Sequence, residues 1–477
     1  MQVRVQDESI SIFHCVESIP QLAQALLSTD PQTAAEACIA FRKILSIDHK
    51  PPIDQVLQAG ILPRLKQFLA ETTRPQVQLE ACWALTNIAS GNSDQTQAVV
   101  ESGVVPHFVD LLRSSDASLQ EQAMWAVANI AGDRPEYRDG CISVGTVEAL
   151  SVILENAIKS NIVQMARLGA WGVSNMCRGK PAPDFERLAA AVPALSKALS
   201  ISNDTEVLAD TAWALSYLTD TANSETVLRI ISFVDLKRLV SLLAHPSNSV
   251  HTPVLRTIGN LVSGESELTR RVVSAGGLSQ LKSLVLSNKK NIRKESLWAI
   301  SNVCADSEFH VQSVIDSGAM DRVCDLLRSG ANDTDIRKEA VWCICNACSV
   351  GNESQIRQLV TDSRFRIIEL LSDSIESSKD TKTVTTCLTA MKKILASAGC
   401  ESENPYTAIL EECGGLTTIE DLQLDESEEI YEAAVDILET FFTCDEDGLV
   451  VRNENIVFDF TSKQPDPNSF TNITRSG

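Results

Sequence analysis

The chain has 477 residues, 44% of them hydrophobic, so it can bury a large core and is too long for a single core unless it is built from repeats. Its 41 lysines and arginines against 63 aspartates and glutamates give a net charge of −22. This balance argues against nucleic acid as a partner and favours basic ligands, unless the acidity serves only solubility.

Neither a secretion signal nor a membrane span is recognisable in the sequence. The first ten residues lack an apolar segment, and no run approaches the roughly 20 apolar residues that a spanning helix needs. The fourteen cysteines lie mostly in apolar helical patterns, which predicts reduced, buried thiols. The closest group, Cys343, Cys345 and Cys348, has no histidine beside it, so we expect no metal and no cofactor.

In chain order, residues 1–9 form a short lead, and residues 10–50 have helical patterning typical of a capping unit. A complete unit follows the pattern of residues 94–133. It predicts a short helix ending at Gly103, a second with Pro106 in its first turn, and a third, longer helix up to Gly132. Ser114, Ser115 and Asp116 supply the turn and the N-cap of the third helix.

A tryptophan followed four residues later by an asparagine marks the third helix of most units. A spacing of four stacks the two side chains on one helix face. The copies are Trp83/Asn87, Trp125/Asn129, Trp171/Asn175, Trp298/Asn302 and Trp342/Asn346, with degraded copies at Trp213/Tyr217 and Arg256/Asn260. Successive copies lie 42–46 residues apart, and all six tryptophans of the chain occupy this position.

This period is typical of helical repeats that cannot bury their apolar faces singly and therefore stack. We expect an all-α superhelical solenoid of stacked three-helix repeats, with a period in the armadillo/HEAT range, over residues 10–445, with an acidic last repeat at about 408–442 and a largely disordered tail at 446–477. If each third helix lines the concave groove, the indoles and amides form a ladder along it.

The ladder suggests its own ligand. Slots between indoles accept the methylene stem of lysine or arginine with the cationic head near a ring face, and asparagine amides can pair with the main chain of an extended peptide. Gln122 and Asp133, Asp210 and Asp220, and Glu295 and Glu339 stand near the ladder as partners for the cationic heads. The residues therefore predict binding of an extended Lys/Arg-rich peptide.

Three alternatives remain open at this point. The tryptophans can be core residues, although paired asparagines and the interruption at Tyr217 and Arg256 argue against that. The chain can be another armadillo scaffold for protein–protein interaction, whose acidic ligands the net charge disfavours. An enzyme is not expected, because the sequence holds no phosphate-binding glycine loop, nucleophile elbow or metal constellation.

The chain resembles the importin-α (karyopherin-α) family of nuclear import adaptors from about residue 10 to 445. The segments that carry the resemblance are A-L-T-N-I-A-S-G at 84–91, A-N-I-A-G-D at 128–133, S-N-M-C-R-G-K-P-A-P at 174–183, W-A-L-S-Y-L-T-D at 213–220 and G-G-L-T-T-I-E-D-L-Q at 414–423. It implies a right-handed superhelical solenoid of about ten armadillo repeats, and a groove that binds nuclear localisation signals with one or two basic clusters, in a protein that shuttles between cytoplasm and nucleus.

The resemblance also implies site residues, in a major site at about 83–178 and a minor site at about 256–346. The major site matches Trp83, Asn87, Gly91, Thr96, Gln122, Trp125, Asn129, Asp133, Trp171, Asn175, Arg178, Asp210 and Trp213, with Gly91, Thr96 and Asp133 as its lysine pocket. The minor site matches Asn260, Thr269, Glu295, Trp298, Asn302, Glu339, Trp342 and Asn346.

Two further expectations concern partner proteins. Residues 1–18 contain one basic residue, Arg4, so the basic, autoinhibitory segment that binds importin-β in the family is not expected here. Without it, importin-β recruitment is not expected in the usual way, and an open variant that sequesters cargo is an alternative to an import adaptor. The acidic last repeat implies contacts with the export receptor and nucleoporins.

Overall fold

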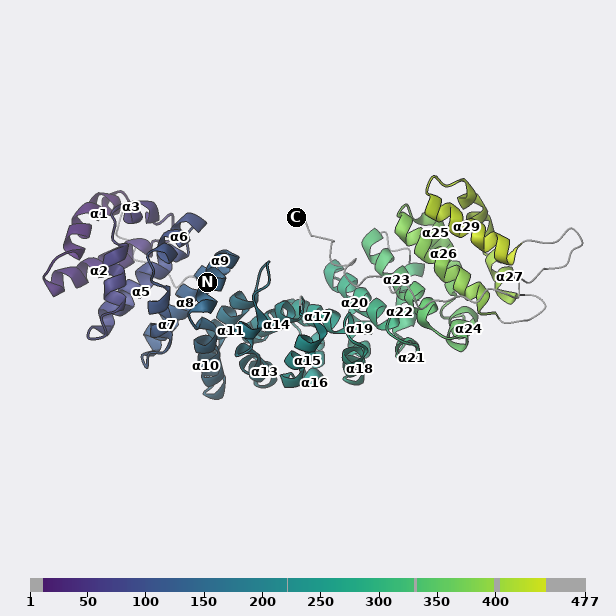
Figure 1. The fold of residues 1–477 in the computed structure, drawn as a ribbon, viewed down its shortest axis with the longest axis horizontal. Helices are drawn as coiled ribbons and strands as arrows, with labels where there is room; N and C mark the ends of the chain where they lie inside the picture. Colours follow the sequence, from purple (N-terminus) through teal and green to yellow (C-terminus); the bar gives the residue numbers. More distant parts are fainter. Residues whose placement is uncertain (1–11, 221, 330–332, 399–403, 443–477) are drawn as a thin grey trace, which may run out of the picture. The chain divides into compact units, whose positions relative to one another are not determined.

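The computed structural model describes residues 12–220, 222–329, 333–398 and 404–442, and every regular element in these ranges is a helix (Figure 1). The expected lead at 1–9 and the tail at 446–477 lie outside the described residues. The chain divides into two compact units, with the boundary between Ile367 and Ile368.

The helices follow one another in groups of three, which confirms the expected all-α repeat architecture. The helices of the first unit are α1 (Ile12–Leu26), α2 (Pro31–Leu45), α3 (Ile53–Gln58), α4 (Leu62–Leu69), α5 (Pro75–Ala89), α6 (Ser93–Glu101), α7 (Val105–Leu112), α8 (Ala117–Asp133), α9 (Pro135–Ser143), α10 (Thr146–Lys159), α11 (Val163–Cys177), α12 (Phe185–Leu188), α13 (Ala191–Ile201), α14 (Thr205–Asp220), α15 (Ser224–Phe233), α16 (Leu236–Ser241) with η1 (Leu242–Ala244), α17 (Asn248–Val262), α18 (Ser266–Ser274), α19 (Gly277–Leu284), α20 (Lys290–Cys304), α21 (Glu308–Asp316), α22 (Ala319–Arg328), α23 (Thr334–Val350) and α24 (Glu353–Thr361). The boundary falls at the start of α25 (Ile367–Ser377), which is followed in the second unit by α26 (Thr381–Ala396), α27 (Pro405–Glu412), α28 (Gly415–Asp421) with η2 (Leu422–Leu424), and α29 (Glu428–Phe441).

The repeat that contains α6, α7 and α8 shows how the sequence sets these boundaries. Asn92 caps α6 in a capping box with Gln95, and Gly103, at φ +72°, takes the left-handed conformation that turns the chain into α7. Asp116 caps α8 by accepting from the backbone N–H groups of Ser118 and Leu119. The predicted helix ends and the predicted cap of this repeat are confirmed.

Third helices form the spine of the first unit. Each of α2, α5, α8, α11, α14, α17 and α20 packs on the third helix of the next repeat, and α23 is the last of this series (Figure 1). In α8, Ala123, Met124 and Val127 are fully buried, and Phe108 of α7 is buried beside them in the same repeat. Because apolar surface is covered jointly by neighbouring repeats, the stack, and not the single repeat, is the stable object.

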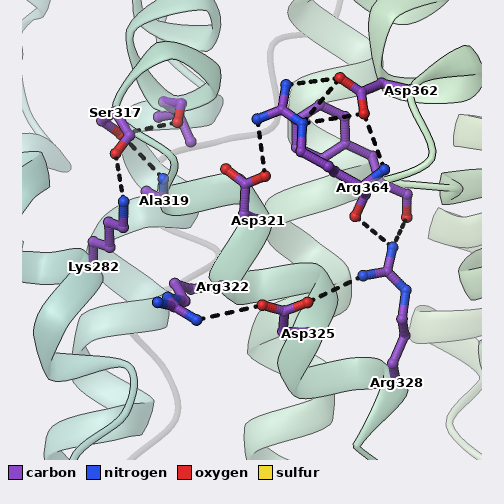
Figure 2. A network of polar contacts seen from close by, with 11 residues as sticks. Lys282, Ser317, Ala319, Asp321, Arg322, Asp325, Arg328, Asp362 and Arg364 are labelled. Carbon is purple, nitrogen blue, oxygen red and sulfur yellow. Dashed lines mark hydrogen bonds and ion pairs between the residues drawn. The ribbon is translucent and has the colours of Figure 1, made fainter.

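Basic side chains tie consecutive repeats together through main-chain carbonyls. Lys282 of α19 donates from Nζ to the carbonyl of Ser317, which follows α21, at 3.0 Å (Figure 2). Lys66 of α4 does the same to Ser102, after α6, at 3.1 Å. Arg328 of α22 donates to the carbonyls of Arg364 and Phe365, after α24, at 2.5 and 2.6 Å. These carbonyls lie at or just after helix ends, where they have no intrahelical partner.

No single helix within the described residues is long and apolar enough to cross a membrane, although the bent pair α9 and α10 reaches that length and composition together.

Replacing Phe108 by alanine should lower the free energy of unfolding by about 3 kcal/mol, because it empties a fully buried site between helices. Urea unfolding followed by circular dichroism measures the change. The matched control is Val152→Ala on α10, where the side chain is 58% exposed and a change within about 0.5 kcal/mol is expected. Equal effects of the two substitutions would contradict the packing described here.

Candidate functional site

The six tryptophans form a half-exposed ridge along successive third helices. Trp83, Trp125, Trp171 and Trp213 lie on α5, α8, α11 and α14, and Trp298 and Trp342 lie on α20 and α23. Every indole is half-buried, whereas both chain neighbours of each are buried. In these six helices the indole is therefore left partly exposed at the surface of the stack, which argues against the core-residue alternative.

The ladder has two blocks, Trp83 to Trp171 and Trp298 to Trp342, and two indoles of the first block contact one another. The rings of Trp125 and Trp171 are 5.1 Å apart between centres, with an interplanar angle of 57°. On α14 the ring of Trp213 stacks on Tyr217 at 5.6 Å and 21°. Tyr217 replaces the usual asparagine, so this repeat presents a stacked aromatic pair and no amide beside its indole.

The asparagines are anchored by the preceding repeat. Asn175 donates from Nδ2 to the carbonyl of Ala128 at 3.0 Å, Asn260 to that of Ser216 at 3.1 Å, and Asn346 to that of Ser301 at 3.1 Å. A carbonyl only accepts, so these bonds fix which end of each amide faces the neighbouring repeat. Asn87 makes the equivalent bond to the hydroxyl of Ser46 at 2.9 Å.

An arginine of the preceding repeat covers the first indole of each block. The guanidinium carbon of Arg42 lies 4.7 Å from the ring centre of Trp83, and Nε of Arg42 pairs with Glu80 at 2.6 Å. Arg256 lies 5.8 Å from the ring centre of Trp298 and pairs with Glu295 at 2.6 Å. These positions already hold a cation on an indole face with an acid beside it, which is the geometry expected for a basic ligand.

The acidic residues near the ladder therefore differ in whether they are free to bind the cationic group of a ligand. Glu295, a predicted partner for a ligand's cationic head, is engaged by Arg256. Asp210, three residues before Trp213 on the same face, has no hydrogen-bond or ion-pair partner in the part of the chain that the structure describes. Burial raises the pKa of Asp210 to about 6, and repulsion from Glu206 adds to this. Burial also raises the pKa of Glu339, against the attraction of Lys294.

The predicted lysine pocket at Gly91, Thr96 and Asp133 is brought together at the junction of α5, α6 and α8. Ser93, which the sequence analysis missed, donates its hydroxyl to Oδ1 of Asp133 at 2.6 Å. Arg134 also contacts Asp133, at 3.2 Å. Thr96 is 1% exposed and donates to the carbonyl of Ala89 at 3.1 Å. The position of Ser93, directly after the N-cap of α6, is the signal that could have identified it.

A buried arginine holds the loop that follows α11. Arg138 of α9 is 1% exposed and donates to the carbonyls of Arg178 and Pro181 at 2.7 and 2.9 Å. The structure thus places Arg178, a predicted site residue with an exposed side chain, directly after α11, where its backbone N–H donates to the carbonyl of Asn175. The lone arginine in an otherwise ordinary helix gave little signal in the sequence.

The remaining predicted residues lie on the same helices as the ladder or next to them. Gln122 is on α8, one turn before Trp125, and Asn129 is one turn after it. Thr269 is on α18 and is fully buried, and Asn302 is on α20 with its Nδ2 buried and without a partner in the described chain. Asp220, at the end of α14, is exposed.

Among the described residues, no group of three or more histidine, cysteine, aspartate or glutamate side chains is placed to hold a metal ion. Cys343, Cys345 and Cys348 are all buried in α23. The Sγ of Cys343 instead donates to the carbonyl of Leu297 at 3.3 Å.

Comparison with known proteins identifies the repeats and the fold of the chain. Models of the armadillo/beta-catenin-like repeat match residues 49–90, 92–132, 189–220, 265–305 and 307–349, and a model of the atypical Arm repeat matches residues 404–457. A solved structure of an engineered protein, 27% identical, aligns with a TM-score of 0.75 over 88% of this chain and 98% of its own.

Two curated plant proteins match nearly end to end. Importin subunit alpha-1b of Oryza sativa subsp. japonica is 41% identical over 459 residues, 94% of this chain and 84% of the relative. Importin subunit alpha-3 of Arabidopsis thaliana is 41% identical over 436 residues, 90% of this chain and 80% of the relative. With the same repeats and this identity over most of both chains, the chain belongs to the importin subunit alpha family of armadillo-repeat proteins.

Proposed function

We propose that this chain binds extended Lys/Arg-rich peptides, the nuclear localisation signals of cargo proteins, along its Trp/Asn ladder. The observation that carries the proposal is the series of partly exposed indoles, each between buried neighbours, on the third helices α5, α8, α11 and α14 and again on α20 and α23. Arg42 and Arg256 support the choice of ligand, because each already lies over an indole and beside a glutamate. An incoming lysine or arginine would find the same surroundings at the uncovered indoles.

The peptide is expected to lie extended across successive repeats. Each anchored asparagine keeps its Oδ1 for a main-chain N–H of the ligand, while indoles on either side accept alternate side chains. The ladder is interrupted at Tyr217 and Arg256, so two clusters of basic residues joined by a linker would occupy the two blocks together. Linked clusters gain affinity through effective concentration.

The family membership extends the proposal from binding to transport. The relatives are named as importin subunits, so we infer an adaptor in nuclear protein import that acts in both cytoplasm and nucleus. We propose no catalytic role. Burial raises the pKa of the Cys141 and Cys304 thiols to about 12, which disfavours the thiolate form that a nucleophilic cysteine needs.

Replacing Trp125 by alanine should weaken binding of a two-cluster Lys/Arg peptide by on the order of 2 kcal/mol, about thirtyfold in Kd, because it removes a wall shared by two slots. Fluorescence anisotropy with a labelled peptide measures the change. The control is Phe233→Ala, an exposed aromatic residue on α15 outside the ladder, for which no change is expected. Unchanged affinity of the Trp125 variant, or displacement of the peptide by an acidic competitor, would refute the proposal.

Peptide affinity should rise with pH between about 5 and 7 through Asp210. The pKa of this carboxyl is raised to about 6 in the free protein, so it is protonated below that pH and becomes an anion above it. A bound cation stabilises the anion, and a decrease of one unit in that pKa corresponds to about a tenfold gain in affinity across the range.

The matching variant is Asp210→Asn, titrated against the same peptide at several pH values. Its profile should be flatter than that of the wild type, with the two converging at low pH. Superimposable profiles would show that Asp210 does not contact the ligand.

A further inference from the structure

Helix α10 extends past α7 in the row formed by the second helices of successive repeats. It has 14 residues, lies between α7 with 8 and α13 with 11, and contacts both (Figure 1). At a rise of about 1.5 Å per residue, roughly 9 Å of α10 has no counterpart in α7. A groove with a volume of about 410 Å³ follows α10, from Arg113 at the end of α7 to Met165 on α11.

Exposed apolar side chains border this groove. Val152 on α10 is 58% exposed, and Ile162, in the turn between α10 and α11, is 50% exposed. Val163, the next residue in the chain, is exposed as well. The floor of the groove consists of buried apolar residues, Leu112, Ala149, Ile153 and Ala157. A single exposed apolar side chain is ordinary, but a group of them around an apolar groove indicates a surface that binds another protein.

The exposed face of α10 carries a stripe of four side chains. Glu148, Val152, Asn156 and Lys159 are separated by three or four residues, so they lie on one side of the helix, and all four are exposed. The first three of them also line the groove. The stripe therefore has an acid at its first end, an apolar residue near its centre and a base at its last end.

The first end of the stripe carries an unpaired negative charge. Glu148 has no hydrogen-bond or ion-pair partner within the part of the chain that the structure describes. Its neighbour across the turn at Gly145 is Arg113, which lies 3.9 Å from Asp110. Because the charges of Arg113 and Asp110 cancel, Glu148 sets the net charge of this end.

The last end of the stripe carries an excess of positive charge. Glu155 is shared by two lysines, Lys159 of α10 at 3.0 Å and Lys197 of α13 at 3.0 Å. Two ammonium groups around one carboxylate leave a net positive charge beside Lys159, whose side chain is half exposed. A partner that matches the stripe must therefore present the reverse order, with a base opposite Glu148 and an acid opposite Lys159.

We propose that the occupant of this groove is a second copy of the chain, with the two α10 helices antiparallel about a two-fold axis. The chain itself presents the required order, because a two-fold axis reverses the stripe and sets Glu148 of each copy opposite Lys159 of the other. Val152 then lies near the axis, within about one turn of Val152 of the other copy. Ile162, just beyond Lys159, reaches the end of the groove at Arg113 of the other copy.

Other occupants match the stripe less well, since a Lys/Arg-rich peptide is repelled at Lys159 and an acidic peptide at Glu148. The contact is small, with one helix from each copy, and the net charge of −22 on each chain opposes it. The dimer is therefore weak and depends on concentration. Because the stripe is on a second helix and the ladder is on third helices, both ladders stay free to bind peptides.

Sedimentation velocity of the full chain over a range of concentrations tests the proposal, in about 0.15 M salt, which screens charges beyond about 8 Å. The wild type should convert from monomer to dimer as its concentration rises. Val152→Glu places like charges near the axis and should raise the dimer Kd at least about tenfold. The matched control is Leu286→Glu, the same kind of change at an exposed apolar residue after α19, which should leave the Kd unchanged.

Charge reversal tests the antiparallel arrangement. Glu148→Lys and Lys159→Glu should each raise the dimer Kd roughly tenfold, because each substitution creates two like-charge pairs per dimer. The double variant exchanges the two charges and should return the Kd to within about threefold of the wild type. This rescue cannot arise within one chain, since the two residues lie about three turns apart along α10.

All these substitutions are at exposed positions, so melting temperatures measured by circular dichroism should match that of the wild type. A wild type that stays monomeric at every concentration would overturn the inference and leave the groove to a different protein. A dimer that Val152→Glu does not weaken, or a double variant that associates no better than either single variant, would overturn it as well.

Discussion

Packing of each third helix against the third helices on either side is the constraint on which the first unit depends. A helix covered in this way by its neighbours has only a narrow strip left for solvent, and in most repeats that strip holds an indole. The buried residues directly before and after each tryptophan fix the direction of the ring, since a rotation of the helix would expose them. The same packing that stabilises the stack therefore spaces and orients the ladder.

Much of the helix arrangement and of the ladder could be predicted from the sequence, because both follow from local chemistry and periodicity. The capping residue Asp116, the turn at Gly103 and the recurrence of tryptophan were sufficient to place the helices and the ladder. The exposure of Trp125 beside buried Met124 and Ala126 could not be read from the pattern, because a helical tryptophan can face either the core or the solvent.

Contacts between repeats were harder to predict, since they join residues about forty positions apart. The repeat pattern indicates Arg256 only as a degraded copy of a tryptophan. The structure places its guanidinium over Trp298 and against Glu295. Ser93 and Ser266 were missed because a serine after an N-cap is common in any helix. Only their shared contact with an aspartate at or just after the end of the third helix of the same repeat, about forty residues later, identifies them.

Intrinsic tryptophan fluorescence is the most direct measurement of the central claim, because all six indoles of the chain occupy the ladder. Titration of the unlabelled protein with a Lys/Arg-rich peptide that contains no aromatic residue should give a saturable change in emission. An acidic peptide of equal length should give none. No change on saturation with the basic peptide, or an equal change with both peptides, would contradict the assignment of the ladder as the ligand-binding surface.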